Sequence, residues 1–346
     1  MVYSCILDDI KTCINLGVPE RVPIFALGEQ FDVRMYGITY AEYTENPEKM
    51  ANCHIEIVRR FGYDWIYLNP DDYIEFEPLG IKTTRMENIP RTAYEYLPPT
   101  WNTVKDLRLP NPKKDGRMPD FLKVIRKVKK ELGNTVCVTG RVAAPFSSVA
   151  LLYGINETLK LIYKNPELIE KTAKFFVELQ TMWGKAQIKA GADAIWLGDC
   201  VASSHFISPK HYLEFAAKEA QEVSESLKKE GTFIFYHAGE DALPHIKIMA
   251  DPGFSCLNIG EGIDIKEVKE AVGNRVCLMG NLDPIKVLQY GTTKEVEEET
   301  KRIMKIGKKN GGYIFNTGEG IPRDTPEENV RTMIQTAKKH SSYQAI

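Results

Sequence analysis

The sequence predicts an α/β protein: a (β/α)8 TIM barrel with an insertion after the second strand. Three observations support this fold class. Eight short β-rich runs alternate with helical stretches along the 346 residues. The runs are almost continuously apolar, as strands of a buried parallel sheet are, and most of them end in glycine or a polar residue. Eight such units in a chain of this length indicate a closed barrel.

The expected strands, in chain order, cover residues 22–29, 64–69, 136–140, 194–199, 232–237, 256–261, 276–281 and 312–317. Helices are expected over residues 157–164, 166–190, 208–229, 264–272 and 293–310. Another helix is expected before Pro19, because Pro19 and Pro23 mark the entry to the first strand. We expect one barrel domain over residues 1–346.

Residues 71–118 break the alternation of strands and helices. They are rich in proline, tyrosine and charge, and Pro98-Pro99 and Pro110-Asn111-Pro112 interrupt regular structure. We expect an insertion after the second strand, made of a small hairpin and a flap over the barrel mouth. The alternative is a surface excursion that only shields the barrel.

Composition excludes several classes of function. Lys+Arg number 45 against Asp+Glu 47, so no strong field attracts the protein to nucleic acid or an anionic membrane. The apolar stretch 142–153 contains two serines and is shorter than the roughly 20 residues that span a bilayer. Residues 1–17 mix charged and apolar side chains and do not resemble a secretory signal, so we expect a cytoplasmic protein. The seven cysteines lack CxxC spacing, which favours reduced thiols.

The strand ends carry the polar residues on which chemistry can depend, because barrel active sites lie at the carboxyl ends of the strands. A histidine, a cysteine and several carboxylates occur there, and imidazole, thiolate and carboxylate are zinc ligands. The residues are Glu29, Asn69, Asp71, Asp72, Arg141, Asp199, Cys200, His237, Glu240, Glu261, Asn281, Asp283 and Glu319.

Several segments resemble the uroporphyrinogen decarboxylase superfamily, and more closely its corrinoid-dependent methyltransferase branch. They are GRVAAPFSSVALLYGINETLKLIYKN, GADAIWLGD, SHFISPKHYLEF, YHAGE, LMGNLDP and NTGEGIPRDTPEENV. The decarboxylases carry an arginine-rich N-terminal segment that binds porphyrin carboxylates. The matching region here is Leu27-Gly28-Glu29-Gln30-Phe31, so we do not expect porphyrin decarboxylation.

The resemblance also implies a zinc site. The branch that methylates coenzyme M holds zinc through a His-x-Cys pair and a cysteine in a Gly-Cys-Gly turn. This chain keeps the histidine as His237, but it has Gly239 at the first cysteine position and Glu319 at the second. Cys200 follows a neighbouring strand and could supply the missing thiolate, with Glu240 as its rival. The expected metal ligands are therefore His237, Cys200 and Glu319.

Two further residues are expected at the catalytic site. Asp199 is expected to orient a ligand, a substrate or a helix end. Arg141 could bind a substrate anion or pair with a strand-end carboxylate. We expect the remaining histidines to be structural or solvated: His54, His205, His211, His245 and His340. The tryptophans could face an aromatic substrate or simply pack: Trp65, Trp101, Trp183 and Trp196.

The resulting hypothesis is a zinc-dependent methyltransferase. It would move a methyl group from a small methoxylated, aromatic substrate to the cobalt(I) of a corrinoid on a separate partner protein. A His, Glu and Cys ligand set is harder than a thiolate-rich one and favours an ether oxygen. The alternatives are a methylcorrinoid:thiol methyltransferase with a variant zinc site, and a metal-free decarboxylase-like barrel in which Glu319 and His237 act as acid and base. The sequence leaves a homo-oligomer open.

Overall fold

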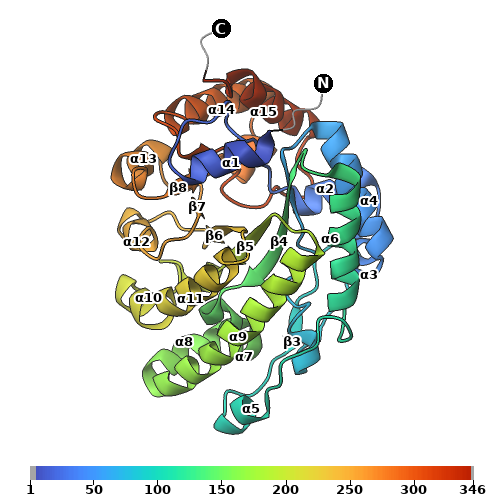
Figure 1. Ribbon diagram of the computed structural model, residues 1–346, viewed down its shortest axis with the longest axis vertical. Helices are drawn as coiled ribbons and strands as arrows, with labels where there is room; N and C mark the ends of the chain where they lie inside the picture. The colour runs from blue at the N-terminus through green and yellow to red at the C-terminus, as the bar shows by residue number, and fades with distance from the viewer. Residues whose placement is uncertain (1–4, 344–346) are drawn as a thin grey trace.

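The computed structural model describes residues 5–343 and has an α/β fold built on a parallel sheet (Figure 1). In this part of the chain the sheet has seven strands, ordered β1-β4-β5-β6-β7-β8-β9, and it curls into an incomplete barrel with helices outside it. The strands are β1 (Trp65–Tyr67), β4 (Cys137–Ala143), β5 (Ala194–Gly198), β6 (Phe233–His237), β7 (Cys256–Asn258), β8 (Cys277–Met279) and β9 (Tyr313–Ile314). Each lies within or overlaps one of the expected runs.

Helices connect successive strands. They are α1 (Ile6–Ile14), α2 (Glu29–Tyr36), α3 (Tyr40–Glu45), α4 (Pro47–Phe61), α5 (Trp101–Asp106), α6 (Met118–Leu132), α7 (Pro145–Tyr153), α8 (Ile155–Lys164), α9 (Pro166–Ala190), α10 (Pro209–Phe215), α11 (Ala217–Lys228), α12 (Leu243–Met249), α13 (Ile265–Val272), α14 (Thr293–Gly307) and α15 (Glu327–His340). Short helical turns are η1 (Glu77–Leu79), η2 (Cys200–Ala202) and η3 (Pro284–Gln289). Among residues 5–343, no helix has both the length and the apolar character needed to cross a bilayer.

One expected helix is broken. Residues 208–229 form α10 and α11, separated at Ala216, whose φ of -121° and ψ of -49° depart from helical values. The other expected helices match observed ones, and the bounds of α9 agree with the prediction.

The first expected strand, 22–29, is wrong as a strand. Ile24 forms a single parallel bridge with Phe315, and Asp64 N–H donates to the Ile24 carbonyl at 2.9 Å. The segment around Ile24 thus lies between the two edge strands of the sheet, β1 and β9. Pro23 has no N–H, and the Ile24 N–H donates to the Asp64 carboxylate at 2.8 Å, so a regular ladder cannot extend. Glu29 is the first residue of α2.

The excursion between β1 and β4 contains the expected small hairpin. β2 (Lys82–Thr83) pairs antiparallel with β3 (Ala93–Glu95), and α5 lies at the far tip of the excursion in Figure 1. A flap over the barrel mouth stays a prediction.

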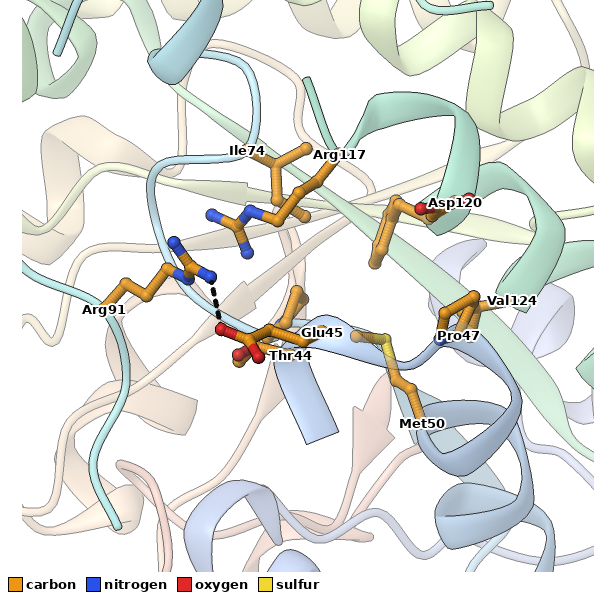
Figure 2. Close-up of a pocket in the computed structure, with 11 residues that line it drawn as sticks. Thr44, Glu45, Pro47, Met50, Ile74, Arg91, Arg117, Asp120 and Val124 are labelled. Atoms are coloured by element: carbon orange, nitrogen blue, oxygen red, sulfur yellow. Dashed lines mark hydrogen bonds and ion pairs between the residues drawn. The ribbon is translucent and has the colours of Figure 1, made fainter. Parts of the chain in front are cut away.

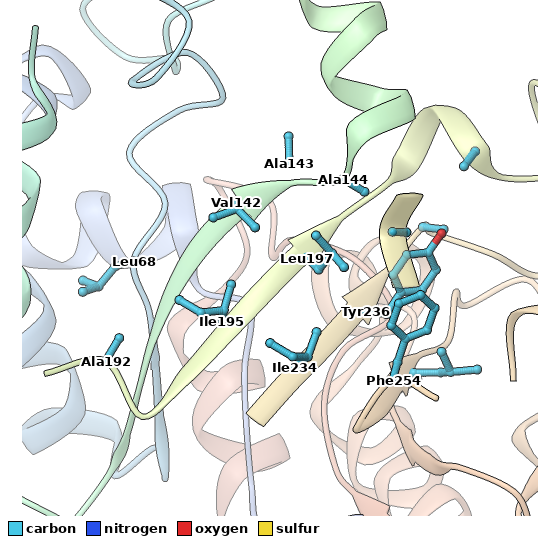
Figure 3. Packing of buried hydrophobic residues seen from close by; sticks show 14 of the residues in the cluster. Leu68, Val142, Ala143, Ala144, Ala192, Ile195, Leu197, Ile234, Tyr236 and Phe254 are labelled. Atoms are coloured by element: carbon cyan, nitrogen blue, oxygen red, sulfur yellow. The ribbon is translucent and has the colours of Figure 1, made fainter. Parts of the chain in front are cut away.

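Two apolar layers stabilise the fold, because alternate strand residues face opposite sides of the sheet. Ile195 and Leu197 of β5 pack outwards with Ile234 and Tyr236 of β6, between sheet and helices (Figure 3). Trp196 of β5 belongs to the other layer, inside the curled sheet.

Helix α1 covers one end of this inner layer (Figure 1). Its Ile6, Ile10 and Cys13 pack in the same cluster as Cys137 and Cys256, which are the first residues of β4 and β7. The amino ends of the strands are therefore closed by apolar side chains, and the polar side chains gather at the carboxyl ends.

Candidate active site

A cavity of about 290 Å³ opens at the carboxyl ends of the strands. Tyr67, Ala143, Gly198 and His237 line it, and they are the last residues of β1, β4, β5 and β6. The other lining residues are Leu27, Glu29, Asn69, Asp72, Arg141, Ser147, Leu151, Ile155, Trp196, Cys200, Val201, Glu319 and Gly320. The structure thus brings Arg141, Cys200, His237 and Glu319 to one cavity.

His237 is held rigidly with one ring nitrogen directed at Glu319. Its Nδ1 lies 2.8 Å from Asn258 Oδ1, while the Asn258 amide NH2 donates to the carbonyls of Met279 and Thr317. Because Asn258 Oδ1 is then the acceptor, Nδ1 carries the hydrogen. Nε2 lies 3.3 Å from Glu319 Oε1. Nε2 is therefore the ring nitrogen that faces Glu319.

Glu319 occupies space that a side chain at position 239 would need. A Cβ placed on Gly239 would lie 2.5 Å from Glu319 Oε1, and Gly239 has a φ of +61°. The glycine and the glutamate are therefore compatible with each other, whereas a larger residue at position 239 would displace the carboxylate.

Cys200 begins η2, directly after β5, and is exposed. It lines the same cavity as His237. Burial lowers the pKa of His237, but the Glu319 carboxylate and the Cys200 sulfur outweigh burial, so the pKa lies well above its ordinary value. Cys200 is thus close enough to influence the imidazole.

Within residues 5–343, no group of three or more His, Cys, Asp and Glu side chains is arranged to hold a metal ion. His237, Glu319 and Cys200 nevertheless share one cavity and supply nitrogen, oxygen and sulfur, which is a donor set that zinc accepts. The zinc-ligand set of His237, Glu319 and Cys200 therefore stays a prediction. The donor atoms of these side chains suit zinc.

Glu240, the alternative third metal ligand, is hydrogen-bonded to loop residues. Its carboxylate accepts from Ser204 N–H at 2.7 Å and Ser204 Oγ–H at 2.6 Å, and from the N–H groups of Asp241 and Ala242 at 3.0 and 2.7 Å. The side chain is buried and is not among the cavity-lining residues. Four donors thus occupy the oxygens that a metal would need.

Asp199 lies behind the cavity wall and not in it. Its carboxylate accepts from the Ser147 hydroxyl at 2.7 Å, the Ser147 N–H at 3.3 Å and the Tyr236 hydroxyl at 2.7 Å. Burial raises the pKa of Asp199 to about 6. Since Ser147 is in the first turn of α7, the contacts match the expectation that Asp199 orients a helix end.

Arg141 pairs with strand-end carboxylates, which was one of its two expected roles. Its Nη2 lies 2.9 Å from Asp72 Oδ1, and its Nη1 lies 3.5 Å from Glu75 Oε1. Its peptide unit is fixed by Gln187, which accepts from Arg141 N–H and donates to Arg141 O, both at 2.8 Å.

The structure also places at the site three residues already named from the sequence, Trp196, Glu29 and Asn69, and it adds Tyr67 and Asn258. Trp196 lies over the imidazole, with ring centroids 4.8 Å apart, and it packs 5.0 Å from Tyr67. Burial raises the pKa of Glu29 to about 7, helped by Glu319 and Asp72 and opposed by a hydrogen bond from Asn69. Glu29 and Asn69 were indicated by their position at the ends of expected strands, whereas Asn258 falls inside the expected strand 256–261 and was not indicated.

A second cavity, of about 210 Å³, lies beside the first turns of α4 and α6 (Figure 2). Its charged lining residues all have charged partners: Arg91 Nη2 lies 3.0 Å from Glu45 Oε1, Arg117 binds Asp71 and Glu77, and Asp120 accepts from Lys123 Nζ. The charges around this second cavity are therefore paired.

Fold and site together define the class of protein: a barrel-like α/β enzyme whose polar cavity lies at the carboxyl ends of parallel strands. Residues 8–340 match the uroporphyrinogen decarboxylase (URO-D) family, and the chain belongs to that family. Two similar relatives are the uroporphyrinogen decarboxylases of Chlorobium phaeovibrioides, 28% identical over 311 residues and 86% of each chain, and of Geobacter metallireducens, 26% identical over 309 residues and 88% of each chain.

Solved structures extend the likeness in fold. A methyltransferase from Methanosarcina mazei superposes with a TM-score of 0.87 at 22% identity, covering 96% of this chain and 98% of its own. A B12-independent methionine synthase from Shewanella superposes with a TM-score of 0.54 at 12% identity, covering 84% of this chain and 85% of its own. The barrel-like fold is therefore shared with a solved methyltransferase and a solved methionine synthase.

Proposed function

We propose that this protein is a zinc-dependent methyltransferase that moves a methyl group from a small methoxylated aromatic compound to the cobalt(I) of a corrinoid carried by a partner protein. The observation that carries the proposal is the convergence of His237, Glu319 and Cys200 in one cavity, with His237 Nε2 and Glu319 Oε1 3.3 Å apart. A zinc ion held by these three side chains would supply Lewis acidity toward an ether oxygen.

The residues around this trio perform the positioning. Asn258 fixes the imidazole ring through Nδ1, so that Nε2 faces the cavity. Trp196 and Tyr67 provide an aromatic wall against which a substrate ring can stack. The cavity of about 290 Å³ is near the lower end of ligand pockets, which start at roughly 300 Å³, so it suits a single-ring compound.

The reaction needs no protein nucleophile. The methyl group would pass to the cobalt(I) of the partner's corrinoid, which is the acceptor substrate, while the carbon–oxygen bond breaks and its electron pair stays on oxygen as a phenolate. The products are methyl-cobalt(III) and, after protonation, a phenol. The protein contributes alignment of the methyl group and stabilisation of the charge on oxygen.

Decarboxylation is the second candidate, because the similar relatives named above are decarboxylases and because Glu319 and His237 could exchange a proton. The cavity opposes it. A polycarboxylated tetrapyrrole would bring its own carboxylates to a cavity that Glu29, Asp72 and Glu319 already line. The basic groups that line the same cavity are Arg141 and His237. The cavity volume also favours a smaller ligand.

One experiment separates these candidates. Purified protein is mixed with free cob(I)alamin and a panel of methoxyphenols, and methyl-cobalt(III) is followed by absorbance while the phenol is quantified by chromatography. We expect stoichiometric formation of both, and about one zinc per chain by elemental analysis. Thiol methylation from methylcobalamin without any ether cleavage would support the thiol methyltransferase, and uroporphyrinogen decarboxylation would support the decarboxylase.

A further inference from the structure

The cavity contains one arginine whose charge is already matched. Arg141 is buried, with 8% of the residue exposed, and its Nη2 lies 2.9 Å from Asp72 Oδ1. Glu75 Oε1 lies 3.5 Å from Nη1 on the other side. Gln187 holds the Arg141 backbone at both its N–H and its carbonyl. The guanidinium is therefore fixed in place and is masked toward an incoming anion.

The two carboxylates that mask Arg141 differ in environment. The Glu75 side chain is 1% exposed, and it accepts from Gln180 Nε2 at 3.3 Å behind the cavity. The Asp72 side chain is 52% exposed and lines the cavity itself. Asp72 is therefore the carboxylate that a ligand of Arg141 meets first.

The pairing of charges at the cavity disfavours a second anion. Each basic group already has an acidic neighbour, because Asp72 contacts Arg141 and Glu319 lies beside His237. A substrate carboxylate bound to Arg141 would also lie close to the Asp72 carboxylate. The two negative charges would repel each other. An uncharged aromatic ring meets no such repulsion and can stack on Tyr67 and Trp196.

We propose that Asp72 is a specificity-determining residue: by neutralising Arg141 at the cavity wall, it makes the site select uncharged methoxyphenols over methoxybenzoates. This inference rests on the proposed function and adds to it the charge of the substrate. Specificity here comes from a repulsive element as much as from an attractive one.

The test is a change of specificity in Asp72→Asn. The substitution keeps the size of the side chain and removes its charge, so it unmasks Arg141 for a substrate carboxylate. We expect the ratio of kcat/KM for a methoxybenzoate to that for the matching methoxyphenol to rise about tenfold or more, as a charge-assisted hydrogen bond would produce. Asp72→Glu should keep the wild-type ratio. Asp251→Asn is the matched control, because Asp251 also pairs with an arginine, Arg275, outside the cavity.

A binding measurement separates this inference from the proposed function. Calorimetry with phenol and 4-hydroxybenzoate, without any corrinoid, reports the charge preference of the cavity whether or not methyl transfer occurs. Tighter binding of phenol by the wild-type protein, with a relative gain for 4-hydroxybenzoate in Asp72→Asn, supports the inference. Equal ratios in both proteins, or a wild-type preference for the benzoate, overturn it even if ether cleavage is observed. Asp72→Ala gives a second reading, and because the side chain is half exposed neither variant threatens folding.

Discussion

Two arginines, the buried Arg141 and the partly buried Arg117, bind the same loop after β1 in opposite ways. Arg117 uses Nε, Nη1 and Nη2 in four hydrogen bonds of 2.6 to 2.9 Å to Asp71 and Glu77, and the Asp71 side chain is fully buried. Arg141 makes one contact of 2.9 Å, with the half-exposed Asp72, and a looser one of 3.5 Å with Glu75. Consecutive aspartates thus belong to different clusters.

The Arg117 cluster is saturated with hydrogen bonds, whereas the Arg141 cluster borders the cavity. Every oxygen of Asp71 and Glu77 has a guanidinium partner, so the Arg117 cluster has no capacity left for a ligand. Glu240 and Glu319 repeat the contrast: four donors saturate Glu240, whereas Glu319 lies at the cavity beside His237. In each comparison, we assign function to the charged side chain that lines the cavity and keeps free hydrogen-bonding capacity.

The largest expected effect tests this contrast on stability. Arg117→Ala should cost about 3–5 kcal/mol in the free energy of unfolding, because it leaves the fully buried Asp71 without a counter-charge. Arg141→Ala should cost less than about 2 kcal/mol, since Asp72 is already half exposed and burial raises the pKa of Glu75 toward the neutral form. Urea unfolding of both variants measures the two values, and equal losses would contradict the distinction.

The second prediction concerns activity. His237→Ala should lower methyl transfer at least about a hundredfold and reduce bound zinc, because it removes the atom on which the site is centred. Asn258→Ala should reduce transfer about 10- to 100-fold, since the ring then loses its orienting partner. His211→Ala is the control, because His211 packs on Tyr163 away from the cavity. Unchanged zinc content in His237→Ala would show that the ligand assignment is wrong.

The third prediction compares how substitutions of Cys200 and Glu240 change zinc retention and stability. Cys200→Ser should weaken zinc retention during dialysis against a chelator while leaving the melting temperature unchanged, because the residue is exposed. Glu240→Gln should do the reverse, costing about 1–3 kcal/mol of stability and keeping the metal, because a neutral amide replaces an acceptor of four hydrogen bonds. If Glu240→Gln lost zinc and Cys200→Ser kept it, Glu240 and not Cys200 would be the third zinc ligand.

The smallest expected effect concerns the buried carboxylate of Asp32, whose partner is a hydroxyl group and not a cation. Asp32 accepts from the Tyr63 hydroxyl at 3.3 Å, and burial raises its pKa from 3.8 to about 8. The folded protein then binds the proton more tightly than the unfolded chain, so stability falls as pH rises through this window. Asp32→Asn should therefore raise the melting temperature by a few degrees relative to wild type, increasingly so from pH 4 to pH 8. A difference independent of pH would show that Asp32 does not titrate there.

The sequence by itself determined most of the sheet. Runs of β-branched and apolar residues predicted the seven strands, because a strand buried on both faces must be apolar along its length, and this requirement is local. The first run failed since Pro23 removes a donor and the Asp64 carboxylate takes the next one, a competition between residues 40 positions apart. The separation of α10 from α11 at Ala216 likewise had no local breaker.

The same division applies to the site. Strand-end positions indicated His237, Cys200, Glu319 and Arg141, because the parallel topology brings all carboxyl ends to one side. Which carboxylates stay free was decided by tertiary structure. The sequence places Asp71 beside Asp72 as near equivalents, but backbone direction sends one to Arg117 and the other to Arg141. Pairing depends on distances between side chains that are remote in the chain, and those distances exist only once the barrel has formed.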